Sequence, residues 1–134
     1  MAEWQDGRCQ VAHWRNTAVL RGYPISRYFN AFNFSIAAAG YNTFHEVLGF
    51  GLPTIFLANR HPSMDDQGAR AEFAQDNGAG FDLPDDQLFH LPALCEALLN
   101  DKARDYVSEC CLGLSRDNGA KQAASAVMNL MGVK

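Results

Sequence analysis

Residues 34–58 read FSIAAAGYNTFHEVLGFGLPTIFLA, and this stretch decides the fold. A strand-length apolar run at 34–38 ends in small residues, and a segment with helical spacing follows it. Gly51 and then Pro53 stop that helix, which we expect over 43–50, and a second apolar run at 54–58 comes next. Strand-length apolar runs that alternate with helices are typical of a parallel α/β sheet, so the stretch predicts two strands and the helix between them.

The same alternation extends in both directions along the chain. Upstream we expect a short strand at 17–20 and a helix at 24–32. Downstream we expect a helix at 67–76 that stops at Asn77-Gly78, and a last short strand at 80–83. Further helices are expected over 92–99, over 102–112 after an Asp101 cap, and over 118–131, where apolar residues have helical spacing. Residues 1–134 are therefore expected to form one domain, whose three or four strands are few for a doubly wound sheet.

The composition limits the classes of function. With 48% hydrophobic and 19% charged residues, the chain has the composition of a globular protein. Its net charge of −4 argues against nucleic acid as a partner, because phosphate backbones are bound by surplus Lys and Arg. No apolar run reaches the roughly 18 residues of a membrane span, and the N-terminus has no signal pattern. Because the four cysteines have neither metal spacing nor the density of a disulfide framework, we expect a reduced, cytoplasmic protein.

Several catalytic signatures are missing from the sequence. Gly49 and Gly51 lack the third glycine of a dinucleotide-binding G-x-G-x-x-G, and neither a P-loop nor a G-x-S-x-G elbow is present. His45-Glu46 begins like a zincin motif, but Gly49 stands where the second zinc ligand is needed. These absences argue against dehydrogenases, P-loop NTPases, α/β-hydrolases and zincin metalloproteases.

The turn between the first strand and its helix carries the candidate binding residues. In an open α/β sheet, ligands bind beyond the carboxyl ends of strands, where helix N-termini present unpaired amides and a positive dipole end to phosphate. Gly40 allows a tight turn and a close ligand, and Asn42 and Thr43 add side-chain donors. One turn further, the Glu46 carboxylate can accept hydrogen bonds from two vicinal hydroxyls, such as those of a ribose. Thr43-x-x-Glu46 is also the pattern of a capping box, in which both side chains bond only the helix's own amides, and local physics leaves the two interpretations open.

Three segments at consistent spacing resemble a known family. Gly40-Tyr41-Asn42-Thr43-x-x-Glu46 resembles the G-[WY]-N-[ST]-x-x-E core of the donor-binding motif in UDP-sugar-dependent GT-B glycosyltransferases. Gly51-Leu52-Pro53 is similar to the family's G-[VL]-P, and Asp66-Gln67 to its closing D-Q. The resemblance covers about residues 33–80 and extends to the peptidoglycan N-acetylglucosaminyltransferase. It implies a Rossmann-like parallel sheet of the GT-B C-terminal-domain type, without its first strand or strands and with C-terminal helices.

The resemblance also implies roles for these residues. Asn42 and Thr43, with backbone amides near Gly40, would hold the diphosphate of a UDP-sugar, and Glu46 the ribose. Asp66 and Gln67 would contact the hydroxyls of a hexosyl group. The family generally needs neither a metal nor a cofactor beyond the donor substrate. One departure is Ala38, which stands where many members have a phosphate-binding histidine.

A second departure concerns the rest of the enzyme. The family's acceptor site and usual catalytic base belong to an N-terminal domain for which this chain is too short, so no catalytic residue is assigned. We expect a fragment or split subunit that is inactive alone and needs an acceptor-binding domain or subunit as its partner. Open strand edges predict a homo-oligomer for the isolated chain. Two alternatives are a nucleotide-sugar epimerase of the same architecture and a non-catalytic module that keeps the fold for partner binding.

Some charged residues near these motifs have simpler interpretations. Asp65 and Asp66 could form a paired-carboxylate site, but we expect Asp65 to be a cap that complements the dipole of the helix at 67–76. Asp66 could also pair with Arg70 at i,i+4. Arg60 and His61 are expected to be loop residues, although either is near enough in sequence to reach a phosphate. His45 is expected to be solvated or to pack on its own helix.

Overall fold

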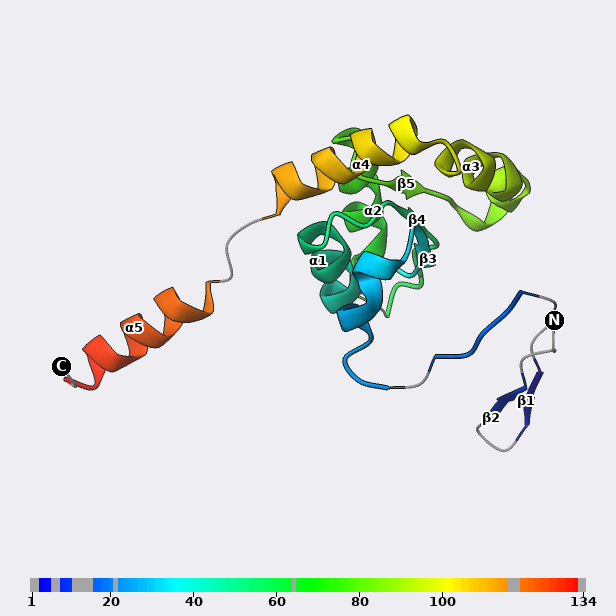
Figure 1. Cartoon of the computed structure of the whole chain (residues 1–134). Helices are drawn as coiled ribbons and strands as arrows, with labels where there is room; N and C mark the ends of the chain where they lie inside the picture. The colour runs from blue at the N-terminus through cyan, green and yellow to red at the C-terminus, as the bar shows by residue number, and fades with distance from the viewer. Residues whose placement is uncertain are drawn as a thin grey trace.

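The computed structural model describes residues 3–5, 8–10, 16–20, 22–63, 65–115 and 119–132. The strands and helices are, in chain order, β1 (Glu3–Gln5), β2 (Arg8–Gln10), the 3₁₀ helix η1 (Ile25–Ala31), β3 (Ser35–Ala37), α1 (Tyr41–Gly49), β4 (Thr54–Phe56), α2 (Gln67–Asp76), β5 (Phe81–Asp82), the 3₁₀ helix η2 (Asp85–His90), α3 (Leu91–Leu98), α4 (Asp101–Leu114) and α5 (Ala120–Leu130). Figure 1 shows α1 to α4 gathered around β3, β4 and β5, with the β1–β2 hairpin and α5 lying apart from them.

The central sheet is parallel, as the sequence predicts. Its order is β3-β4-β5, and α1 and α2 supply the two connections between successive strands. Ser35 pairs with Thr54 and Ala37 with Phe56, while Ile55 pairs with Phe81. The chain is therefore an α/β fold with a three-stranded Rossmann-like sheet.

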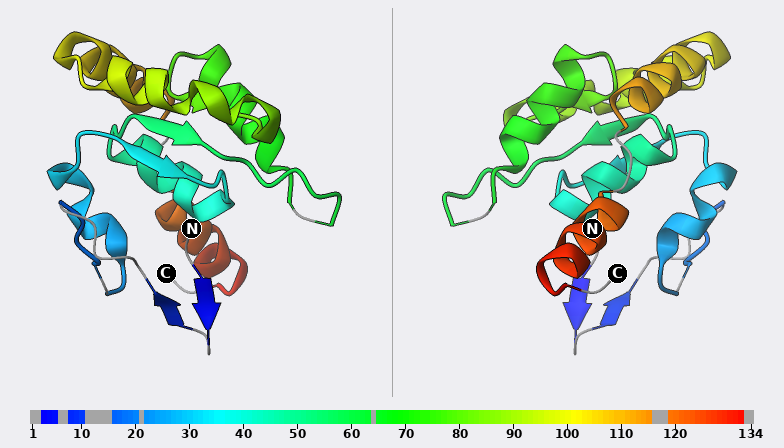
Figure 2. Two further views of the ribbon diagram at one scale, coloured as in Figure 1. Left: turned by 90° about the vertical axis from the view of Figure 1, so that its right-hand side faces the viewer. Right: turned by 90° about the vertical axis from the view of Figure 1, so that its left-hand side faces the viewer.

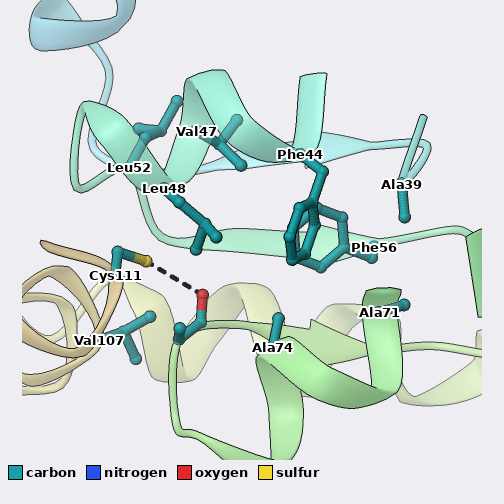
Figure 3. Close-up of a cluster of buried hydrophobic side chains, with 11 residues drawn as sticks. Ala39, Phe44, Val47, Leu48, Leu52, Phe56, Ala71, Ala74, Val107 and Cys111 are labelled. Atoms are coloured by element: carbon teal, nitrogen blue, oxygen red, sulfur yellow. Dashed lines mark hydrogen bonds between the residues drawn. The ribbon is translucent and has the colours of Figure 1, made fainter. Parts of the chain in front are cut away.

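One face of the sheet is covered by α1, α2 and α4. Phe56 of β4 is fully buried there against Phe44 of α1, with the two ring centroids 5.7 Å apart. Figure 3 shows Ala71 and Ala74 of α2 close to these rings, where small residues let the helix approach the sheet. The full buried cluster is Ala39, Phe44, Val47, Leu48, Leu52, Phe56, Ala71, Ala74, Ala79, Val107 and Cys111.

A buried thiol ties α4 to the segment before β5. Cys111 donates a hydrogen bond from Sγ to the carbonyl oxygen of Ala79 at 3.0 Å (Figure 3). Burial, and secondarily the neighbouring Cys110, raises the pKa of the Cys111 thiol to about 11, so the thiol stays protonated at neutral pH and can donate.

The opposite face of the sheet is covered less completely. Ile55 and Leu83 are buried against Leu98 at the end of α3. Ile36 of β3 is in register with Ile55 and so lies on the same face, yet its side chain is 46% exposed. Helix α3 therefore covers β4 and β5 but leaves the edge strand β3 open on this side.

The end of α1 is built as expected from Gly51. Gly51 has φ of +61°, its N–H bonds to the carbonyl of Leu48 at 3.0 Å, and the N–H of Leu52 bonds to that of Val47 at 2.9 Å. These two bonds form the Schellman ending of a helix, which requires a left-handed residue and favours glycine. This turn sends the chain directly into β4.

Most predicted elements are present, and the differences are local. The helix over 67–76 is confirmed at both ends, but α1 begins at Tyr41, two residues earlier than predicted. The segment at 24–32 forms a 3₁₀ helix, and its Ile, Tyr, Phe and Asn residues have low α-helix propensity. The strand predicted at 17–20 is wrong, since no described strand pairs with it. The hairpin of β1 and β2 was not predicted. Helix α4 is capped by Asn100 instead of the predicted Asp101. Residue 118, where the last helix was predicted to begin, lies outside the described residues.

Candidate functional site

The N-terminus of α1 lies directly after β3. Gly40 is the N-cap residue, with extended backbone angles and no side chain to cap the helix. The first bond within the helix runs from the N–H of Phe44 to the carbonyl of Gly40 at 2.8 Å. The N–H groups of Tyr41, Asn42 and Thr43 therefore have no partner in the helix and remain available to a ligand.

This geometry contradicts the capping-box interpretation of Thr43 and Glu46. A capping box needs Thr43 at the N-cap, but Thr43 is the third residue of α1 and Glu46 the sixth. Glu46 bonds elsewhere: its Oε1 accepts a hydrogen bond from Oγ of Ser26 at 3.3 Å. Ser26 is buried in η1, so η1 supports Glu46 from the side.

A cavity of about 590 Å³ opens beside this helix terminus. Three of the six predicted site residues, Asn42, Thr43 and Glu46, line it. His45 also lines it, and its ring packs on Tyr41 of its own helix with 4.5 Å between centroids, as expected for a helix-packing role. The lining is completed by Gly22, Tyr23 and Pro24, just before η1, and by Ile25, the first residue of η1.

The other two predicted side chains, Asp66 and Gln67, lie at the start of α2. They line a second cavity of about 450 Å³ together with Asn59, Arg60, His61, Pro62, Asp65, Gly68, Ala69 and Glu72. Asp66 is the N-cap of α2, and its Oδ1 accepts from the N–H of Ala69 at 3.0 Å. Gln67 is buried, accepts from the N–H of Asn59 at 3.1 Å and donates to Asp65 at 3.4 Å. The Gln67 side chain thereby links the two ends of the β4–α2 connection, whose described residues run outward from the sheet in Figure 2.

Arg70 bonds the segments before α1 and α2, and its partners differ from the predicted Asp66. Its Nε donates to the carbonyl oxygen of Ala39 at 2.7 Å, and its Nη2 pairs with Asp65. The predicted pair of Asp66 with Arg70 is therefore wrong, as is the prediction of Asp65 as the helix cap, because Asp66 takes that position and Asp65 turns to Arg70. No signal within the sequence pointed to Ala39, since it lies 31 residues away.

Arg60 holds the start of the same loop. Its guanidinium pairs with Glu72 of α2 at 3.1 Å and with Asp82 of β5, and these hydrogen bonds, with Asp82 the larger cause, raise the pKa of Arg60. Gly68 makes room for it, because a Cβ there would lie 2.7 Å from Nη1 of Arg60. Oδ1 of Asp82 is buried without a hydrogen-bond partner among the described residues. Arg60 is thus a loop residue with structural partners, as expected.

A parallel sheet with a helix N-terminus at the end of a strand defines a Rossmann-like domain. Residues 5–125 match the family model described as the glycosyltransferase family 28 C-terminal domain. This match spans most of the sequence, and the chain belongs to that family. It is a C-terminal domain of the GT-B glycosyltransferase type. A comparison with curated proteins gave no match.

Among the described residues, no group of three or more His, Cys, Asp or Glu side chains is arranged to hold a metal ion. Likewise, none of the described helices is both long and apolar enough to cross a membrane.

Proposed function

We propose that this chain binds a UDP-sugar at the N-terminus of α1 and forms the donor half of a hexosyltransferase. The observation that carries the proposal is the uncapped start of α1, which faces a cavity of about 590 Å³ in a member of a glycosyltransferase family. Free amides and the positive end of the helix dipole there favour an anion such as a diphosphate. The family match favours a transferase over an epimerase.

The residues around this terminus suit the parts of a nucleoside diphosphate. Asn42 and Thr43 are in the first turn, next to the free amides, and we assign them with Gly40 to the diphosphate. Glu46 has one carboxylate oxygen bonded to Ser26, and its other oxygen can accept from a ribose hydroxyl. The bond from Ser26 limits the rotamers of Glu46, which reduces the entropy lost on binding.

We assign the sugar to the second cavity. Asp66 uses one carboxylate oxygen to cap α2 and keeps the other for a sugar hydroxyl. The Gln67 side chain is held by Asn59 and Asp65, so its contribution is to shape the loop around the sugar and to offer its remaining amide proton.

For the transfer step, we propose that α1 replaces a metal ion. When the bond between the anomeric carbon and the diphosphate breaks, negative charge develops on the leaving UDP. The helix dipole and the free amides of the first turn stabilise that charge, and their fixed orientation means that little reorganisation is needed.

The acceptor and the catalytic base belong to a partner in this proposal. An acceptor-binding domain or subunit would face the carboxyl ends of β3 and β4, and the chain alone would bind donor without transferring sugar. We place the protein in the cytoplasm, which agrees with the free thiols of Cys95, Cys110 and Cys111.

A titration of the ¹⁵N-labelled chain with UDP tests donor binding. We expect saturable shifts of the amide signals of residues 40–46, weaker shifts with UMP, and weaker still with uridine, because the diphosphate contributes most of the interaction with the helix terminus. If saturating UDP leaves these signals unmoved in a folded sample, the donor-site proposal is wrong.

A further inference from the structure

Arg70 bonds both the segment before α1 and the segment before α2. It is the fourth residue of α2 and its side chain is only 20% exposed. One nitrogen bonds the carbonyl of Ala39, just before α1, and another pairs with Asp65, just before α2. Among the residues that the structure describes, no other side chain bonds both of these segments. Arg70 itself lines neither cavity.

The bond to Ala39 acts on the peptide that precedes α1. The carbonyl of Ala39 and the N–H of Gly40 belong to the same peptide unit. A cation that bonds the carbonyl polarises this unit, so the N–H at its other end becomes a stronger donor. The positive charge of Arg70 also adds to the positive potential at the start of α1.

The pair with Asp65 acts on the β4–α2 loop. Asp65 also accepts from Gln67 and directly precedes Asp66, so Arg70 is linked through Asp65 to both residues assigned to the sugar. Arg60 holds the other end of this loop, but its partners are Glu72 and Asp82, and it does not reach Ala39.

We propose that Arg70 is a positioning residue that couples the diphosphate part of the donor site to the sugar part. This proposal rests on the proposed function. When an anion binds at α1, the Ala39–Gly40 peptide adjusts to it, and Arg70 passes that adjustment through Asp65 to Asp66 and Gln67. Occupancy by the nucleotide thereby changes the position of residues 65–67.

The UDP titration can detect this coupling, because UDP lacks the transferred sugar that would contact the loop directly. In the wild-type chain we expect the amide signals of residues 65–67 to shift together with those of 40–46 and to report the same Kd. In Arg70→Gln, residues 40–46 should still shift, with a Kd raised about tenfold, whereas residues 65–67 should no longer respond. Arg70→Lys, which keeps the charge but cannot bridge two acceptors, should also lose the response of 65–67.

Two variants separate coupling from general damage. Asp65→Asn should abolish the response of residues 65–67 while its Kd for UDP stays within about twofold of wild type, because the bond to Ala39 remains. Arg104→Gln is a matched control: Arg104 is 19% exposed, bonds the carbonyls of Leu98 and Leu99 and pairs with Asp101, but lies on α4. It should behave as wild type.

The outcomes distinguish this proposal from the donor site itself. If UDP shifts residues 40–46 but not 65–67 in the wild-type chain, or shifts both equally in Arg70→Gln, the coupling is overturned and the donor site stands. Equal loss in Arg104→Gln also overturns it. If UDP shifts no signal in the wild-type chain, the donor site and the coupling fail together.

Discussion

At the scale of the residue, Glu46 illustrates how one side chain had two reasonable interpretations. The sequence pattern allowed a helix cap or a ligand for ribose. Because α1 begins at Tyr41, Glu46 lies too far along the helix to bond the N-cap amide. Its bond to Ser26 leaves it half-buried at the cavity wall, so a test of its ligand role is not complicated by the loss of a cap.

We predict that Glu46→Gln raises the Kd for UDP about tenfold, since a charged acceptor for the ribose hydroxyls is replaced by a neutral one. The affinity for 2′,3′-dideoxy-UDP should be the same in wild type and variant. Isothermal titration calorimetry with both ligands measures this, and Glu109→Gln on the exposed surface of α4 is the control. Equal UDP affinity in wild type and Glu46→Gln would remove Glu46 from the ribose site.

At the scale of the element, the end of α1 determines how the helix and β4 are joined. Gly51 combines a left-handed φ of +61° with tight packing, because a Cβ there would lie 2.8 Å from Oγ of Ser108 and 3.0 Å from Cγ of Leu112. Both neighbours are on α4, which packs against α1. The glycine is therefore needed by the turn and by the contact between two helices.

We predict that Gly51→Ala lowers the free energy of unfolding by about 2–4 kcal/mol, through backbone strain and overpacking against α4. Gly113→Ala should have the opposite sign, with a gain of up to about 1 kcal/mol, because Gly113 lies in α4 with nothing within 4 Å of its added Cβ. Urea denaturation followed by circular dichroism measures both. An unchanged midpoint for Gly51→Ala would mean that the turn relaxes easily.

At the scale of the whole molecule, apolar surface remains uncovered. Among the described strands, β3 pairs with β4 alone, and Ile36 on β3 is half exposed. Helix α5 lies apart from the sheet in Figure 1, and Val127 and Met128 are exposed on it. Surfaces of this kind favour association.

We predict that the isolated chain self-associates, with a sedimentation coefficient that increases between about 10 and 500 μM as association proceeds by mass action. Ile36→Lys should reduce association if the edge of β3 is the contact, because an edge lysine opposes strand pairing. Val127→Glu should do so if α5 is the contact. A single monomeric species over the whole concentration range would refute the prediction.

The sequence by itself determined most elements around the parallel sheet, and it indicated the family. The helix at 67–76, the strands near 35–37 and 54–56, and the ending at Gly51 follow from apolar period and turn chemistry, which act within a few residues. The spacing of three motifs indicated the glycosyltransferase type that the family match establishes. For the candidate site, the sequence supplied the residue types and their order along the chain.

Only the tertiary structure decided which of those residues meet. It rejected the capping box at Thr43, gave the cap of α2 to Asp66, and brought Arg70 to Ala39 across 31 residues. In the tertiary structure, no described strand pairs with residues 17–20, and Ile36 is exposed. The physical reason is range: periodicity and capping depend on neighbours within a turn or two, whereas a hydrogen bond between α2 and the segment before α1 depends on how both pack against the sheet.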